Sequence, residues 1–155
     1  MKNTLLIAFL EALDSDDDAT FNIEHYTDVP KGVQKPKPDP LAGRYANLTR
    51  RRVQELLPKL QARNEAGAGI FIARNQCDGH RSEKAISRVR GVHADMDDVS
   101  SKELADLIGL LQPSIVVESS LGRFQLYWQL SEDEYLEPAE AKAINQCLAS
   151  QYGAD

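Results

Sequence analysis

The chain has 155 residues, 42% of them hydrophobic, which is enough to bury one sizeable core, and we expect a single domain over residues 1–155. The formal net charge of -6 and the pI near 5.1 argue against a protein that holds duplex nucleic acid mainly through bulk positive charge. The N-terminal apolar run is too short for a signal peptide and no later segment approaches membrane-spanning length, so we expect a cytoplasmic protein without membrane contact.

Apolar periodicity and turn signals predict the elements of the first half of the chain. Residues 5–13 favour an amphipathic helix that ends at the acidic run beginning with Asp14, and residues 21–29 favour a strand before a long proline-rich loop. A second helical pattern spans residues 53–60, where we expect Pro58 to kink or split the helix.

The second half continues the alternation of strand and helix. Residues 70–73 are apolar on both faces, as expected of a central strand that is covered on both sides. Residues 90–97 favour another strand, and Ser100 with Glu103 forms a capping box that opens the next helix. The remaining predicted elements are strands over residues 115–117 and 124–130 and a helix that begins at Pro138 and stops before Gly153. This order predicts an α+β fold, with a mostly antiparallel sheet and helices packed on it.

The strand over residues 90–97 carries the first motif with chemical content. Because strand side chains alternate between two faces, His93, Asp95 and Asp97 are expected to share one of them. Paired carboxylates are the ligands that hard divalent cations prefer, and two such cations assist phosphoryl displacement. We therefore interpret Asp95 and Asp97 as candidate catalytic ligands of Mg²⁺ or Mn²⁺. With 24 acidic residues in the chain, an ordinary solvated acidic strand end is the alternative.

The segment that follows residues 115–117 offers a candidate cradle for a triphosphate. Ser119 and Ser120 supply hydroxyl groups beside a glycine turn, and the guanidinium group of Arg123 suits phosphate oxygens. Strand alternation places Gln125 on the face opposite the apolar residues, so we expect it to line the site. The same residues also fit an ordinary hairpin with a polar turn.

These motifs together resemble the RepB-like DNA primases of plasmids, phages and integrated elements, within the archaeo-eukaryotic primase superfamily. The similarity rests on residues 67–71, 75–81 and 86–90, on the strand with Asp95 and Asp97, and on the Ser-Ser-x-Gly turn that leads to Trp128. It implies an RNA-recognition-motif-like catalytic sheet that performs two-metal nucleotidyl transfer from nucleoside triphosphates on a single-stranded DNA template. It also implies a fused or neighbouring helicase in many members. Where this chain has Gln125, many superfamily members have a histidine.

The resemblance gives further residues a role. Arg81, Arg88 and Arg90 form a local positive stripe before the acidic strand, and we expect them to contact template or nucleotide phosphates. The superfamily uses a third acidic ligand, for which Asp155 is the candidate. RepB-like sequences continue past this region, so we expect residues 1–155 to be a primase catalytic domain truncated near its C-terminal end.

Two functions from other classes stay open. Asp95 and Asp97 also fit the aspartyl-nucleophile motif of haloacid-dehalogenase-like phosphatases, although that motif normally follows the first strand of a doubly wound domain. A non-catalytic module on the same fold would instead bind single-stranded nucleic acid by stacking bases on Tyr127. The aromatic content of 6% and the clustered carboxylates argue against this second alternative.

Overall fold

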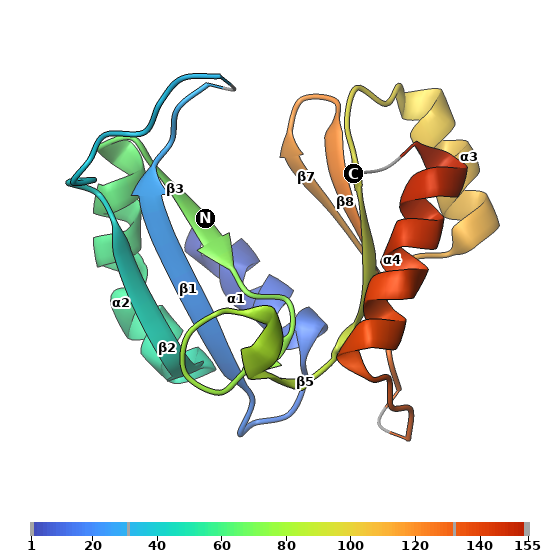
Figure 1. The fold of residues 1–155 in the computed structure, drawn as a ribbon, viewed down its shortest axis with the longest axis horizontal. Coiled ribbons are helices and arrows are strands. Elements are labelled where there is room, and N and C mark those ends of the chain that lie inside the picture. The colour runs from blue at the N-terminus through green and yellow to red at the C-terminus, as the bar shows by residue number, and fades with distance from the viewer. Residues whose placement is uncertain (1, 31, 132, 154–155) are drawn as a thin grey trace. The chain divides into compact units, whose positions relative to one another are not determined.

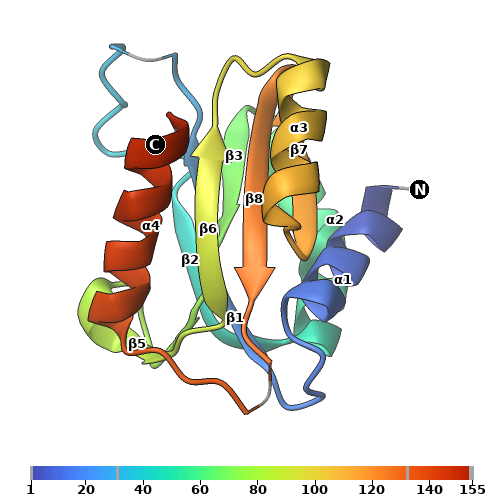
Figure 2. The same ribbon diagram turned by 90° about the vertical axis from the view of Figure 1, so that its right-hand side faces the viewer.

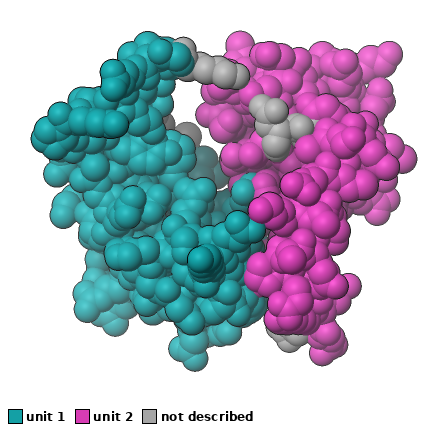
Figure 3. All heavy atoms as spheres, in the orientation of Figure 1, with its two compact units in different colours: residues 1–88 teal, residues 89–155 magenta. Residues whose placement is uncertain are grey.

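The computed structural model describes residues 2–30, 32–131 and 133–153, and for residues 2–4 it describes the backbone alone. The chain divides into two compact units, Met1–Arg88 and Val89–Asp155 (Figure 3). The first unit contains α1 (Lys2–Leu13), β1 (Thr20–Thr27), β2 (Gly43–Thr49), α2 (Arg50–Glu65), β3 (Ala68–Ile72), β4 (Gln76–Cys77), the short 3-10 helix η1 (Glu83–Ala85) and β5 (Ile86–Arg88) (Figure 1). The second unit contains β6 (Gly91–Met96), α3 (Ser101–Leu111), β7 (Ile115–Ser120), β8 (Arg123–Gln129) and α4 (Pro138–Tyr152). None of the helices in these ranges combines the length and apolar character needed to cross a membrane.

In the first unit, β1 is the central strand of a three-stranded sheet, with β2 and β3 antiparallel on its two sides. Helix α2 contacts all three strands and buries Val53, Leu57 and Leu60. Phe21 and Ile23 of β1 are fully buried, as expected for residues two apart on the covered face. The core of this unit therefore lies between α2 and one face of its sheet.

The structure of the first unit differs from the predictions in three details. The segment over residues 70–73 is not a central strand, because β3 lies at the edge of its sheet and its residues after Ala68 are only partly buried. Strand β2 was not predicted at all, since its sequence alternates small and polar residues without an apolar pattern. Helix α2 continues through Pro58 instead of splitting there, because its buried leucines hold both halves against the same sheet.

The second unit has its own antiparallel sheet, in the order β6-β8-β7. Ala94, Met96 and Leu126 form the buried centre of its core, against which leucines of α3 and the residues Leu148 and Tyr152 of α4 pack. Figure 2 shows α3 and α4 over the same face of β6 and β8. The α+β prediction with antiparallel sheets is confirmed, and every strand pairing found in the described residues is antiparallel. The described part of the chain therefore lacks the parallel sheet that a haloacid-dehalogenase-like domain requires.

Helix α3 begins at the predicted capping box. The hydroxyl of Ser100 accepts a hydrogen bond from the Glu103 amide, and the Glu103 carboxylate accepts from the backbone amide and the hydroxyl of Ser100. These hydrogen bonds lower the pKa of Glu103, and the bond from the Ser100 hydroxyl has the largest effect. Because the pKa of Glu103 is lower in the folded state, these hydrogen bonds stabilise the fold at pH values above the ordinary pKa of glutamate. That stabilisation is lost as the pH falls through the folded-state pKa.

We expect Ser100→Ala to lower the free energy of unfolding of the second unit by about 1 kcal/mol, because a helix N-cap is lost. Trp128 is the only tryptophan and lies in this unit, so its fluorescence during urea denaturation reports the change. Ser101→Ala, one position inside the helix, is the matched control and should leave the midpoint unchanged. Equal midpoints for Ser100→Ala and the wild type at neutral pH would contradict the capping role.

Candidate catalytic site

Asp95 lies in β6 between two core residues and faces away from them. Ala94 and Met96 are each 4% exposed in the core under α3 and α4, so strand alternation directs Asp95 to the opposite face of the sheet. In the residues that the structure describes, Asp95 Oδ1 is buried without a hydrogen-bond partner. An unpaired buried carboxylate oxygen costs a fold on the order of 1–3 kcal/mol or more, and such an atom calls for a ligand that compensates it.

Asp97 follows β6 directly and has a different environment. Its side chain is 49% exposed, and its Oδ1 lies 3.6 Å from Nε of Arg123. The next residue, Asp98, has φ of 58°, so the chain turns sharply after the carboxylate pair. The amide of Val99 then donates to the carbonyl of Gly122, which ties this turn to the hairpin between β7 and β8. The two loops that carry Asp97 and Arg123 are thus fixed to each other.

Strand β8 places Gln125 directly opposite Asp95. The hydroxyl of Tyr127 donates to Oε1 of Gln125 over 2.7 Å. Because that bond occupies the amide oxygen, the NH₂ group of Gln125 is the part that is left to donate to a ligand. Strand alternation puts Tyr127 on the same face as Gln125, and a spacing of two residues along a strand is a signal for such a contact, but this role of Tyr127 was not predicted.

The hairpin between β7 and β8 is tighter than the sequence predicted. Ser119 and Ser120 belong to the end of β7, and the turn itself consists of Leu121 and Gly122. Gly122 has φ of 75°, a conformation that glycine adopts without strain. The hydroxyl of Ser119 donates to the carbonyl of Arg123, so this serine braces the hairpin. Both serines are exposed, and their contact with nucleotide stays a prediction.

His93 is held by a residue that the sequence did not reveal. Its backbone amide donates to Oδ1 of Asn145 in α4 over 2.9 Å, and Nδ2 of Asn145 lies 3.1 Å from its Nδ1. Since the amide nitrogen of asparagine can only donate, Nδ1 accepts and the ring proton lies on Nε2. Asn145 also occupies the outer edge of β6, where a backbone donor would otherwise lack a partner. No local signal links two residues 52 positions apart.

A hollow of about 440 Å³ lies beside Asp97 in the second unit. It is lined by carboxylates of Asp97, Asp98, Glu103 and Asp106 and by apolar residues that include Leu107 and Leu110. Among the residues that the structure describes, no group of three or more His, Cys, Asp or Glu side chains has the arrangement of a metal site. Asp155, the predicted third ligand, lies outside the described residues.

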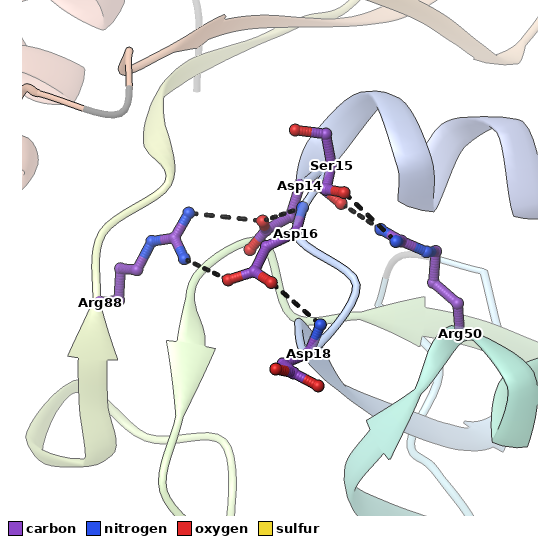
Figure 4. Close-up of polar contacts among 6 residues, drawn as sticks. All are labelled: Asp14, Ser15, Asp16, Asp18, Arg50 and Arg88. Carbon is purple, nitrogen blue, oxygen red and sulfur yellow. Dashed lines mark hydrogen bonds and ion pairs between the residues drawn. The ribbon is translucent and has the colours of Figure 1, made fainter.

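Two of the three arginines predicted to contact phosphate have carboxylate partners in the first unit. Arg88 reaches Asp14 at 3.3 Å and Asp16 at 3.9 Å, at the acidic turn that ends α1 (Figure 4). The Asp14 side chain is 2% exposed, so the guanidinium of Arg88 compensates a buried charge. Arg81 lies 3.9 Å from Glu24. Arg90 belongs to the second unit and is buried. Contact of these three arginines with phosphate stays a prediction.

We expect Arg88→Gln to lower the free energy of unfolding by about 1–3 kcal/mol, because the buried carboxylate of Asp14 loses a charged hydrogen-bond donor. Far-ultraviolet circular dichroism during urea denaturation measures the loss. Arg52→Gln is the matched control, because Arg52 pairs with Glu55 on the surface of α2 and such pairs contribute little. If both variants unfold at the wild-type midpoint, the Arg88–Asp14 pair has no structural role.

Comparison with known proteins identifies the family. A model of the RepB DNA-primase N-terminal domain matches residues 41–155, which is most of the chain. The fold resembles the catalytic domain of primase RepB′ in complex with initiator DNA, with a TM-score of 0.65, 18% identity and coverage of 100% of this chain and 70% of that one. The fold also resembles a second crystal structure of primase RepB′, with a TM-score of 0.64, 19% identity and coverage of 99% of this chain and 45% of that one. The archaeo-eukaryotic primase domain of the cyanophage S-2L primase-polymerase gives 0.65 at 18% identity over 96% and 72%. A comparison with curated protein sequences gives no match.

The chain therefore belongs to the RepB DNA-primase family, as the sequence motifs predicted. The family match covers the candidate site, from β6 through the hairpin to α4, as well as β2 to β5 of the first unit. At identities below one fifth, the solved structures establish the fold, and the α+β architecture of this chain is that of a primase catalytic domain.

Proposed function

We propose that this chain carries the nucleotidyl-transfer site of a DNA primase, which joins nucleoside triphosphates or deoxynucleoside triphosphates on a single-stranded DNA template. The observation that carries the proposal is the buried, unpaired Oδ1 of Asp95, with Gln125 opposite it and Asp97 two residues further on. Membership of the RepB primase family supports it, as does the complex of a structurally similar primase with initiator DNA. The proposed setting is replication of a plasmid, phage or other mobile element, with a fused or neighbouring helicase as partner.

The donor set fits Mg²⁺ or Mn²⁺. Asp95 offers a carboxylate oxygen without a partner, and Asp97 offers a second, exposed carboxylate on the same strand end. Cations of this kind prefer carboxylate oxygen, and they take their remaining ligands from water and substrate phosphates. When bound, they would stabilise the charge on the attacking and leaving oxygens of the phosphoryl displacement.

The other site residues bind and orient the triphosphate in this proposal. The NH₂ group of Gln125, fixed by Tyr127, donates to a phosphate oxygen, and it does so without a titratable charge. Arg123 is 57% exposed and has only a long contact with Asp97, so its guanidinium would be able to donate to a phosphate oxygen. Positioning by such fixed donors lowers the barrier because the reacting groups are held in line.

A non-catalytic module that binds single-stranded nucleic acid by stacking on Tyr127 is less well supported. Tyr127 is 6% exposed, and its hydroxyl is bonded to Gln125, so its ring offers little surface to a base. A template-dependent extension assay with labelled nucleotide distinguishes the three candidate functions. A primase incorporates nucleotide, a phosphatase releases phosphate, and a binding module does neither.

We expect Asp95→Asn and Asp97→Asn each to reduce nucleotide incorporation about 100-fold or more, because each removes a cation ligand. Neither should lower the melting temperature of the metal-free chain, since both relieve negative charge. Added Mn²⁺ should raise the melting temperature of the wild type and not that of the variants. Asp98→Asn is the matched control one position further on, where φ of 58° suits asparagine. Near-wild-type incorporation by either ligand variant would refute the assignment.

We expect Arg123→Ala to lower kcat/KM for the nucleotide about tenfold or more, because a charge-assisted phosphate contact is lost. Thermal stability should change little, since an exposed ion pair contributes on the order of 0–1 kcal/mol. Steady-state kinetics and a thermal melt of the same preparation check both statements. Arg51→Ala, which breaks an exposed pair with Glu55, is the control. Unchanged kinetics with a lowered melting temperature would favour an ordinary hairpin.

A further inference from the structure

The basic residues of this acidic protein are concentrated in the first unit. Residues 1–88 carry 14 of the 18 lysines and arginines and 12 of the 24 acidic residues, whereas residues 89–155 carry four basic and 12 acidic residues. A polyanion is therefore attracted by the first unit and repelled by most of the second. The net charge of the whole chain, -6, hides this separation.

The first unit also has an aromatic pair on its sheet. Tyr26 of β1 and Phe71 of β3 are stacked, with ring centroids 4.4 Å apart and planes 13° apart. The other face of the sheet is the one that α2 covers, since Lys59 of α2 lies over the ring of Tyr45 and Tyr45 contacts His25. Strand alternation puts Tyr26, next to His25, on the face opposite α2. Both stacked rings are only partly buried there.

Gly69 makes this arrangement of the rings possible. It lies opposite Tyr26 in the register of β1 and β3, and the ring of Phe71 lies above it. A Cβ at position 69 would come within 2.8 Å of Cε2 of Phe71, so any other residue would push that ring away from its place beside Tyr26. The glycine of the Gly-Ile-Phe sequence thus serves the aromatic pair.

Cations surround the aromatic pair on the same face. Nζ of Lys35, from the loop between β1 and β2, lies 3.5 Å from the centroid of the Tyr26 ring. Arg44 and Arg81 share the carboxylate of Glu24, at 3.4 Å and 3.9 Å. Carboxylates lie here as well: Asp28 is beside Gly69 on this face, and Asp39 interacts electrostatically with Lys35, so with Glu24 they balance the three cations. Aromatic rings beside lysine and arginine side chains are the combination that single-stranded nucleic acids bind.

We propose that this face of the first unit, defined by Tyr26, Phe71, Lys35, Arg44 and Arg81, binds single-stranded DNA by base stacking and phosphate contact. The inference rests on the proposed function, for which it supplies a template-binding surface. A base that stacks on Tyr26 takes the place of the Lys35 ammonium, whose flexible side chain then reaches the adjoining phosphate. Single strands are favoured over duplex because only unpaired bases expose their faces to aromatic rings.

Fluorescence anisotropy with labelled oligothymidylate tests the proposal, at fixed salt and with a chelator that keeps the carboxylate site out of the measurement. We expect Tyr26→Leu and Phe71→Leu each to weaken binding roughly 5- to 100-fold, the range found when one stacked base loses its ring. Tyr26→Phe keeps the ring and should bind like the wild type. Tyr45→Leu removes an aromatic ring from the opposite face of the same sheet and is the matched control.

Lys35→Gln tests the same surface without touching the sheet, because Lys35 lies on an exposed loop. It should reduce the slope of log affinity against log salt concentration by about 0.7, the value for one phosphate contact on a single strand. Wild-type affinity in Tyr26→Leu and an unchanged slope in Lys35→Gln would overturn the proposal. Equal affinity of the wild type for blunt duplex and for oligothymidylate would also overturn it.

The test of this binding surface can fail or succeed independently of the test of the catalytic site. If the wild type incorporates nucleotide while Tyr26→Leu binds oligothymidylate normally, the template surface is wrong and the catalytic assignment stands. If binding depends on Tyr26 but the wild type incorporates no nucleotide with Mg²⁺ or Mn²⁺, the catalytic assignment fails and the binding surface stands. In an active enzyme, Tyr26→Leu should raise the template concentration needed for half-maximal rate and leave the saturated rate nearly unchanged.

Discussion

The antiparallel pairing of β6 with β8 is the constraint on which the candidate site depends. It sets Asp95 opposite Gln125, and it sets Ala94 opposite Leu126 on the face that α3 and α4 cover. A shift of the register by one residue would turn the carboxylate into the apolar core and the apolar residues out of it. The burial of one face therefore fixes the position of the polar groups on the other. The energetic cost of the unpaired Asp95 oxygen is borne by this packing.

The two units differ in charge in a way that fits two kinds of ligand. The second unit gathers carboxylates around the end of β6, and in the proposed function a cation at Asp95 and Asp97 would relieve the repulsion between those two side chains. The first unit holds most of the lysines and arginines, which suit a phosphate backbone. The net charge of the whole chain averages over these two units of opposite charge. It argues against bulk attraction to duplex DNA but says nothing about a local basic face.

Several arginines have a structural role in addition to any role in ligand binding. Arg88 compensates the buried Asp14, and Arg50 donates to the carbonyls of Asp14 and Ser15 at the same turn (Figure 4). The acidic run after α1 is thus more than a solvated helix end, because two cations far along the chain fix it. A sequence motif alone assigns such arginines to phosphate, since it does not reveal which carboxylates compete for them.

The sequence by itself determined the elements with local signals and the family to which the chain belongs. The capping box of α3, the proline that opens α4, the alternation of β6 and β8 and the family resemblance are all carried by neighbouring residues, and the structure and the family match agree with them. Tertiary structure alone decided that β1 rather than β3 is central, that Pro58 lies within one helix and that Asn145 holds His93. These features arise from contacts between residues far apart in the chain. Local propensity does not encode such contacts, because their energy appears only when the two segments pack.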